Sequence, residues 1–533
     1  MRILVVAQLA GIPEVGWNHR SLSIAPKWKL LMRLMLSLVA TIFAAGVACA
    51  AGGELTLKVE EESDLSATIA RAEIWRGQPG GKLMPIRRVV PAGVGVVLDR
   101  NVKLALPDGS YSFRMTRGPE YRIVTGTFAL EDTSSDTHAV QLPRMIDMLS
   151  KGWVSGDCLV VASQESLPLR MASEDLHMAT TLGHVPAKPV PYRDSDDPIK
   201  NDPAWVETGA AHFDGLAFYG EGTFNDKDLI PVQRMIAAKK DASVRVAIEN
   251  PFAWPLPVWL ASQRVDGMFL LGDWLRLDRK VLTVKNGRRP GTSFGGGQAV
   301  GLWAEDIYRH VLDAGIQMPP LAGGGSDSAR TPVGYNRLYV GKPSNEYQES
   351  NLDTEPVGSA QEWWQAAWSG HSVATNGPLM RPALDGFLPG HVFDATAGDS
   401  LELQPELSLS TRDAVEYIEV VHNNRVHYSG RLKDFAKAKG VIPKITVEKS
   451  GWVIIRVVTL HEDHLRAAIS APWYIRFDDQ PRVGKESVEF FQSWLSDYEA
   501  RLKRLPPEEL KKHVPFIQAA RKFWAQKQSV AVK

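Results

Sequence analysis

Residues 152–184 read GWVSGDCLVVASQESLPLRMASEDLHMATTLGH, and this stretch decides the fold. Its apolar run at residues 158–162 is typical of a short buried strand. Asp157 stands directly before that run, and His177 and His184 follow it. Barrel folds built from strands and helices place their chemistry at strand ends. These three side chains are therefore the first candidates for a functional site.

The surrounding region, residues 149–380, changes repeatedly between strand and helix patterns. Short apolar runs predict strands at residues 244–248 and 267–271. Apolar residues at helical spacing predict helices at residues 229–239 and 305–314. This alternation predicts an α/β fold, either layered or closed into a barrel.

The regions on either side contain short strands and turns instead. Residues 51–148 include the period-2 run ELTLKVE at 54–60, and residues 381–480 include similar runs. We therefore expect a β-sandwich on each side of the α/β region.

Residues 481–533 form a predicted helical tail. One helix face carries apolar residues at i, i+3 and i+4 spacing, namely Val488, Phe491, Leu495, Tyr498 and Leu502. Pro506 and Pro507 break this helix, and a second helix is expected from Glu508 onward.

Composition narrows the classes of partner. Lys plus Arg equals Asp plus Glu at 61 each, so no basic excess favours a nucleic-acid partner or an anionic membrane surface. The 16 tryptophans fit a large core, or a platform that stacks sugars, and the core interpretation is favoured. Of the two cysteines, Cys158 is expected to be a small core residue rather than a nucleophile.

An export signal is expected within residues 1–50. Residues 32–51 read MRLMLSLVATIFAAGVACAA, with basic residues before a short apolar run and an A-x-A cleavage site before Ala51. Translation starting at Met32 would fit this signal better than a start at Met1. The expected location is secreted or periplasmic, with no membrane attachment beyond the signal.

Several segments resemble one known family. The residues GW-x-SGD at 152–157 and the run EDLH at 174–177 resemble the opening motif of the PHP-type (polymerase and histidinol phosphatase) metallohydrolases, in their secreted CehA/McbA-like branch. The runs VRVAIENPFAWPLPVWLA, GGGSDSARTPVGYNRLYV and EWWQAAWSGHSVATNGPL resemble later segments of the same family, in the same order.

The resemblance implies a distorted PHP-like β/α barrel flanked by two β-sandwich domains and a C-terminal helical tail. It also implies a site for up to three metal ions, in which metal-bound water supplies hydroxide. However, Leu159 and Val161 stand where the family carries an HxH pair, and an aliphatic side chain cannot bind a divalent metal.

Some candidate ligands remain at the positions that the family uses. The metal-ligand candidates are Asp157, His177, His212, Glu249 and Asp273. The catalytic candidates are Glu249, Asp157, His177 and Asp327. Glu249 is the strongest of them, because a carboxylate at the end of a buried strand is costly unless it is paired or coordinates a metal.

Other polar residues have simpler interpretations. Glu174 and Asp175 are expected to cap a helix and to be solvated. His461 and His464, in the segment HEDH, are expected to lie in a solvated turn far from the barrel. A lone histidine is more often a hydrogen-bonded structural residue than a metal ligand.

Two functions remain open from the sequence. The first is an exported PHP-like metallohydrolase relative with an eroded metal site, acting as a weak or altered hydrolase with a divalent metal (Mn, Mg or Zn). The second is a non-catalytic pseudoenzyme that needs no cofactor and binds a small molecule or a glycan. A set of ligands dominated by carboxylates would favour Mg or Mn over Zn.

Overall fold

The computed structural model describes residues 53–131, 135–162, 165–182, 204–222, 224, 226, 228–276, 282–283, 285–326, 331–343 and 352–532. The expected export signal, His184 and Asp327 lie outside these residues. None of the described helices is both long and apolar enough to span a membrane.

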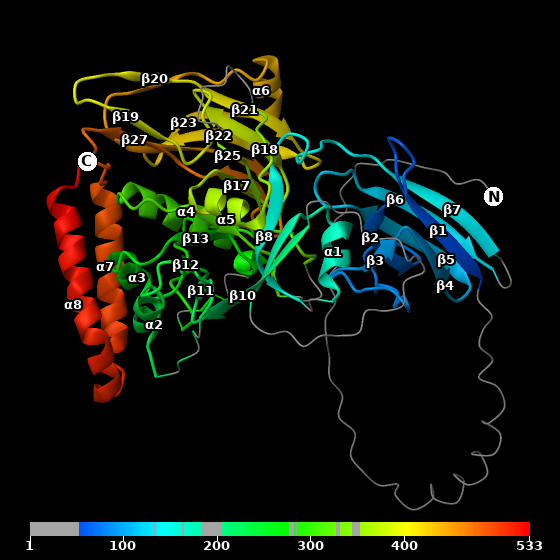
Figure 1. Cartoon of the computed structure of the whole chain (residues 1–533), viewed down its shortest axis with the longest axis horizontal. Helices are drawn as coiled ribbons and strands as arrows, with labels where there is room; N and C mark the ends of the chain where they lie inside the picture. The colour runs from blue at the N-terminus through cyan, green and yellow to red at the C-terminus, as the bar shows by residue number, and fades with distance from the viewer. Residues whose placement is uncertain are drawn as a thin grey trace, which may run out of the picture.

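The first seven strands form two sheets at one end of the molecule (Figure 1). One sheet has the order β4-β1-β7 and the other β3-β2-β5-β6. Their bounds are β1 Glu54–Glu61, β2 Ile69–Arg76, β3 Val96–Asp99, β4 Asn101–Ala105, β5 Gly109–Thr116, β6 Val124–Leu130 and β7 Ser135–Leu142. The alternation in ELTLKVE buries Leu55, Leu57 and Val59 in one core with residues of the facing sheet, such as Ile74.

The central strands form a closed circuit. The order β14-β13-β12-β11-β10-β9-β8 is hydrogen-bonded throughout, and β15, which follows β14 in the chain, pairs with β8. The bounds are β8 Val154–Val161, β9 Met178–Leu182, β10 Trp205–Phe213, β11 Leu216–Tyr219, β12 Arg245–Ile248, β13 Gly267–Leu271, β14 Pro320–Ala322 and β15 Gly325–Ser326.

All these strands run in one direction except β11, which is antiparallel to both of its neighbours. The carboxyl ends of β8, β9, β10, β12, β13 and β14 therefore meet at the same edge of the circuit.

Helices pack around the circuit. They are α1 Leu167–Ser173, α2 Pro231–Ala238, α3 Leu256–Ala261, α4 Ala299–Asp313 and α5 Ala360–Trp368, with a 3-10 turn, η1, at Asp273–Arg276. Helix α5 begins where the Ser359 side chain accepts a hydrogen bond from Glu362 N. Its Trp363 is fully buried and packs so closely on Gly156 that a Cβ there would lie 2.3 Å from the ring. Trp259, Trp363 and Trp364 are all buried, which confirms the interpretation of these tryptophans as core residues.

The same sheet continues into the C-terminal part of the chain. From β8 its path runs through β16, β17, β26, β25, β22 and β23, and β27 pairs with both β25 and β19, giving a mixed sheet of 16 strands among the described residues. The C-terminal elements are β16 Arg337–Val340, β17 Ser372–Thr375, β18 Leu379–Leu384, β19 Val392–Ala395, β20 Leu401–Leu403, β21 Pro405–Ser410, β22 Val415–His422, β23 Arg425–Gly430, α6 Leu432–Lys437, β24 Ile445–Val447, β25 Gly451–Thr459, β26 Ala467–Ser470 and β27 Trp473–Phe477.

Two long helices, α7 (Lys485–Leu502) and α8 (Pro507–Ser529), lie side by side at the end opposite the first sheets (Figure 1). The predicted apolar face of α7 is buried along its length, which confirms that prediction. Pro507 is the first residue of α8, where a missing backbone N–H costs nothing. The expectation of a mixed α/β chain with C-terminal helices is confirmed, and the domain boundaries stay predictions.

Candidate functional site

Three of the predicted site residues lie at the carboxyl edge of the central circuit. His212 is near the end of β10, Glu249 follows β12 directly, and Asp273 opens the 3-10 turn after β13. His212 Nδ1 lies 3.3 Å from Glu249 Oε2. The hydrogen bond to Glu249 raises the pKa of His212, and the nearby charge of Asp273 acts in the same direction. The structure therefore brings an imidazole and two carboxylates toward one another.

Local contacts hold Glu249 at this edge. Its backbone N–H donates to the carbonyl of Gly215, and its own carbonyl accepts a hydrogen bond of 3.1 Å from Trp274 Nε1. Trp274 in turn packs edge-on against Phe252, with ring centroids 5.0 Å apart. The Glu249 side chain is 23% exposed and the His212 side chain 47% exposed, so this pair faces solvent.

Asp157 lies inside the structure and is used differently. Its Oδ1 accepts hydrogen bonds from the backbone N–H groups of Leu159 (3.0 Å) and Gly324 (2.9 Å). Its Oδ2 accepts one of 2.8 Å from Gly334. Burial raises the pKa of Asp157 to about 7, against these hydrogen bonds and the charge of Arg337, which act to lower it. The carboxylate thus ties β8 to two distant loops.

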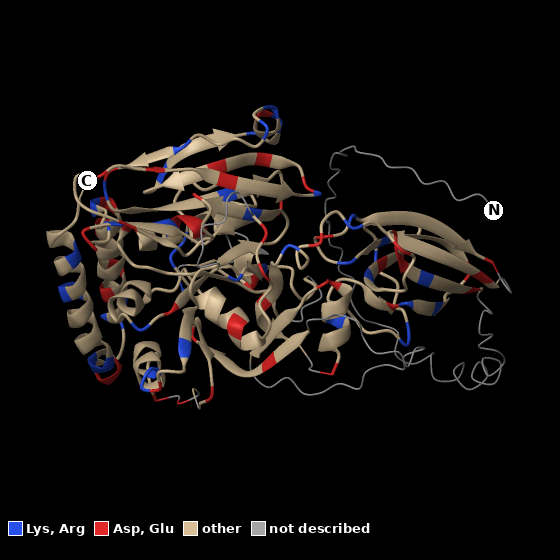
Figure 2. Cartoon of the chain, turned by 45° about the horizontal axis from the view of Figure 1, so that its top comes forward, with Lys and Arg blue, Asp and Glu red and all other residues tan. Residues whose placement is uncertain are grey.

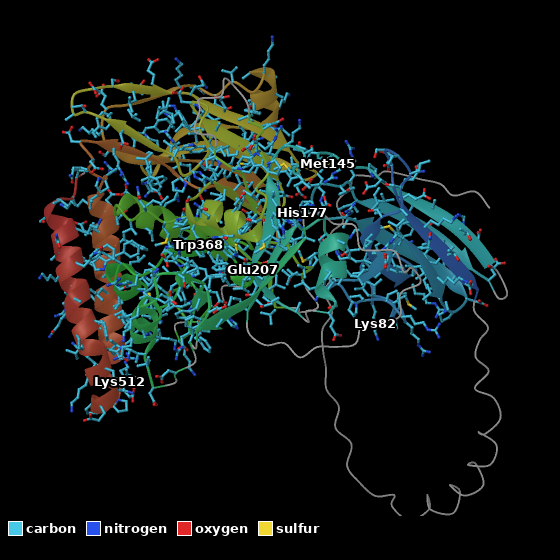
Figure 3. All side chains as sticks on the ribbon, viewed as in Figure 1. Lys82, Met145, His177, Glu207, Trp368 and Lys512 are labelled. Atoms are coloured by element: carbon cyan, nitrogen blue, oxygen red, sulfur yellow. The ribbon has the colours of Figure 1, made fainter. Side chains whose placement is uncertain are left out.

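His177 stands at the amino end of β9 (Figure 3). Because β9 and β10 are parallel and His212 is near the carboxyl end of β10, the two histidines lie on opposite sides of the circuit. Its backbone N–H donates to Ser155 O, and its Nδ1 is 3.0 Å from Ser155 Oγ. Burial lowers the pKa of His177, although the charge of Asp175 acts to raise it. A buried imidazole with a hydroxyl partner fits a structural role.

Asp175, next to His177, belongs to a buried ionic cluster between the first sheets and the central circuit. Its carboxylate meets Arg117 at 3.1 Å and Arg144 at 2.7 Å, and Arg144 also reaches Glu120 at 3.1 Å. Burial and the charge of Asp175 together raise the pKa of Glu120 to about 7.

The expectation that Glu174 and Asp175 are solvated is wrong, although Glu174 does cap a helix, as the C-cap residue of α1. They are only 4% and 2% exposed, and they follow α1 instead of preceding a helix. Arginines from the first sheets, which are far away in sequence, pair with them: Arg71 with Glu174, and Arg117 with Asp175.

A metal ion fits these residues poorly. Among the residues that the structure describes, no group of three or more His, Cys, Asp or Glu side chains could hold a metal ion. Asp157 has both oxygens engaged by backbone N–H groups, and Leu159 and Val161 supply no donor atoms. His177 lies on the opposite side of the circuit, and Asp327 lies outside the described residues.

One polar region was missed by the sequence interpretation. His464 is 4% exposed, and its Nε2 lies 2.6 Å from the hydroxyl of Tyr335, in the loop before β16. The expectation of a solvated turn is therefore wrong for His464. Both residues line a cavity that also contains several arginines. The HEDH segment was a signal, but nothing in it showed that Tyr335 lies beside it.

Cys158 is fully buried and unpaired with another cysteine, and burial raises its pKa. A thiol held in its neutral form in the core is unreactive, which confirms the expectation of a core residue.

Comparison with known proteins adds little. No family model and no curated protein matches this chain. Among solved structures, the Bacillus anthracis TIE protein is 21% identical over an alignment that covers 21% of this chain and 20% of that chain, with a TM-score of 0.14. An alignment of about a fifth of each chain at that score carries no argument about fold or function.

Proposed function

We propose that this chain is an exported, non-catalytic relative of the PHP-type metallohydrolases that binds a small molecule. In this proposal the closed circuit of β8–β14 is the distorted PHP-like barrel, and the sheets before and after it are the two flanking β-sandwich domains. Support comes from the motif resemblance and from the common direction of six strands in the circuit.

The proposal that the chain is non-catalytic rests on the hydrogen bonds that Asp157 accepts. A carboxylate that ligates a metal must present a lone pair to it, and this one presents its oxygens to Leu159, Gly324 and Gly334. The residue holds the scaffold together where a metalloenzyme would hold an ion.

A second candidate function is a weak hydrolase, and the His212–Glu249 pair favours it. An imidazole hydrogen-bonded to a carboxylate at the carboxyl edge of a barrel can act as a general base. Asp273 could assist by stabilising the protonated imidazole.

A hydrolysis screen separates the two functions. The chain without residues 1–50 is tested on phosphate, carboxylic ester and amide substrates, with and without added Mn²⁺. Our proposal expects no turnover above background. Turnover that disappears in Glu249→Ala and persists in Asp214→Asn, at an exposed carboxylate in the turn between β10 and β11, would establish the hydrolase instead.

A further inference from the structure

A cavity of about 450 Å³ opens where three parts of the chain meet. The first sheets contribute residues such as Arg71 and Arg114, and the loop before β16 contributes Tyr335. The C-terminal strands and their turns contribute Arg412 and Arg466. Lys and Arg are otherwise interspersed with Asp and Glu over the described chain (Figure 2), so this gathering of arginines is local.

The cavity is strongly biased toward positive charge. Five arginines line it, the four above and Arg337, whereas its acidic lining residues are Glu174 and Asp463. Three of the arginines have carboxylate partners. Arg71 pairs with Glu174 and Glu73, Arg114 pairs with Glu73 at 2.7 Å, and Arg466 pairs with Asp413 at 2.9 Å.

The other two arginines donate hydrogen bonds to neutral carbonyl and hydroxyl oxygens. Arg337 donates to the carbonyls of Gly334 and Glu174, at 2.6 and 3.1 Å. Arg412 Nη1 donates to Thr116 Oγ1 and to the carbonyls of Gly118 and Tyr121.

Arg412 also has an unsatisfied donor. Its Nε is buried and has no hydrogen-bond partner among the described residues. Burial lowers the pKa of Arg412 to about 10; the charges of Arg466 and Arg71 act in the same direction, and those of Asp413 and Glu174 act against it. A largely buried guanidinium with an unsatisfied donor is costly unless an anion approaches that donor.

The cavity lining also includes further polar groups and an aromatic ring. Tyr335 and His464 are hydrogen-bonded to each other, and Arg466 lies over the Tyr335 ring with 5.9 Å between Cζ and the centroid. The His461 and His464 rings are 4.5 Å apart. The tyrosine and histidine rings can contact the organic part of a ligand while the arginines bind its charged group.

We propose that this cavity binds a small organic anion through a phosphate or carboxylate group, which docks against Arg412 between the three parts of the chain. The planar guanidinium fork matches the oxygens of both groups, and the cavity volume suits a metabolite-sized molecule. The site is distinct from the His212–Glu249 edge, so the proposal stands whether or not that edge is catalytic.

Titration calorimetry with inorganic phosphate and with citrate, at constant ionic strength set by chloride, tests this proposal on the chain without residues 1–50. We expect saturable binding of at least one anion at one site per chain. Preference for phosphate or for citrate identifies the docking group. Arg412→Gln should weaken binding at least tenfold, because it removes the charged donor. Arg264→Gln, at an exposed arginine outside the cavity, should leave the affinity unchanged.

Arg114→Gln serves as a second variant, because the Arg114 side chain is 47% exposed and the buried Glu73 keeps its pairing with Arg71. It should weaken binding severalfold. The proposal is overturned if neither anion binds, or if Arg114→Gln and every folded Arg412 variant bind as tightly as the unmodified chain.

Discussion

The replacement Asp157→Asn tests whether this residue is a structural hydrogen-bond centre. Asparagine has nearly the same shape, but its amide nitrogen cannot accept a hydrogen bond, whereas both oxygens of an aspartate side chain can, protonated or not. With the asparagine oxygen facing Leu159 and Gly324, its amide group opposes the backbone N–H of Gly334, which lies 2.8 Å from Oδ2 in the native chain. Leaving a buried N–H unsatisfied costs about 1–3 kcal/mol.

The cost should depend on pH. The pKa of Asp157 rises from 3.8 to about 7 on folding, so between these values the native chain keeps a proton that the unfolded chain has lost. The stability contributed by that proton is complete below about pH 4 and is lost as the pH rises through 7. The loss amounts to roughly 4 kcal/mol. The Asn variant lacks this titration, so its deficit relative to the native chain is largest near pH 4–5 and shrinks toward pH 8.

Equilibrium unfolding in urea, followed by tryptophan fluorescence at pH 5, 6.5 and 8, measures this difference. Asp214→Asn is the matched control, because the Asp214 side chain is 57% exposed and an asparagine oxygen can still accept the hydrogen bond from Arg234. Equal unfolding midpoints for the two variants at pH 5 would refute the structural role of Asp157. A deficit that grows with pH would refute the sign of the pKa change.

Two further substitutions probe the packing. Arg144→Met leaves the buried carboxylates of Asp175 and Glu120 without their shared partner. It should lower the free energy of unfolding, measured by urea titration, by about 3–5 kcal/mol. A change below about 1 kcal/mol would contradict this expectation. Gly156→Val places a side chain against the Trp363 ring, where even a Cβ would approach to 2.3 Å, so near-UV circular dichroism should show lost tertiary structure or the chain should be insoluble. Gly81→Ala, whose Cβ would meet only the Gln78 carbonyl oxygen at 3.9 Å, should behave like the native chain, and a native spectrum for Gly156→Val would show that the contact is not constraining.

Local patterns predicted the local elements well. The strand at residues 267–271 and the buried face of α7 follow directly from hydrophobic periodicity, because both are set by neighbouring residues. The short apolar runs separated by turns at residues 51–148 likewise indicated the strands of the first sheets.

The site depended on contacts that no local pattern contains. Asp157 is held by Gly324 and Gly334, more than 160 residues away, so its use as a hydrogen-bond centre could not be foreseen. The motif around His177 did not reveal which end of β9 that residue occupies. His177 lies at the amino end because β9 begins at Met178, directly after it.

The arginine cavity shows the same limit. Its residues come from three parts of the chain, and each arginine alone looks like an ordinary surface residue. Only the assembled fold shows that Arg412 lies near Arg466 and Arg71 in the lining of one cavity.

The most direct test of the non-catalytic proposal is elemental analysis by mass spectrometry. The chain without residues 1–50 is purified without chelators, and its Mn, Fe, Zn and Ni contents are measured, with a separate titration for weakly held Mg²⁺. The account predicts well below one equivalent of each transition metal and no saturable Mg²⁺ binding. About one equivalent of a metal per chain that is lost in Glu249→Ala would contradict it.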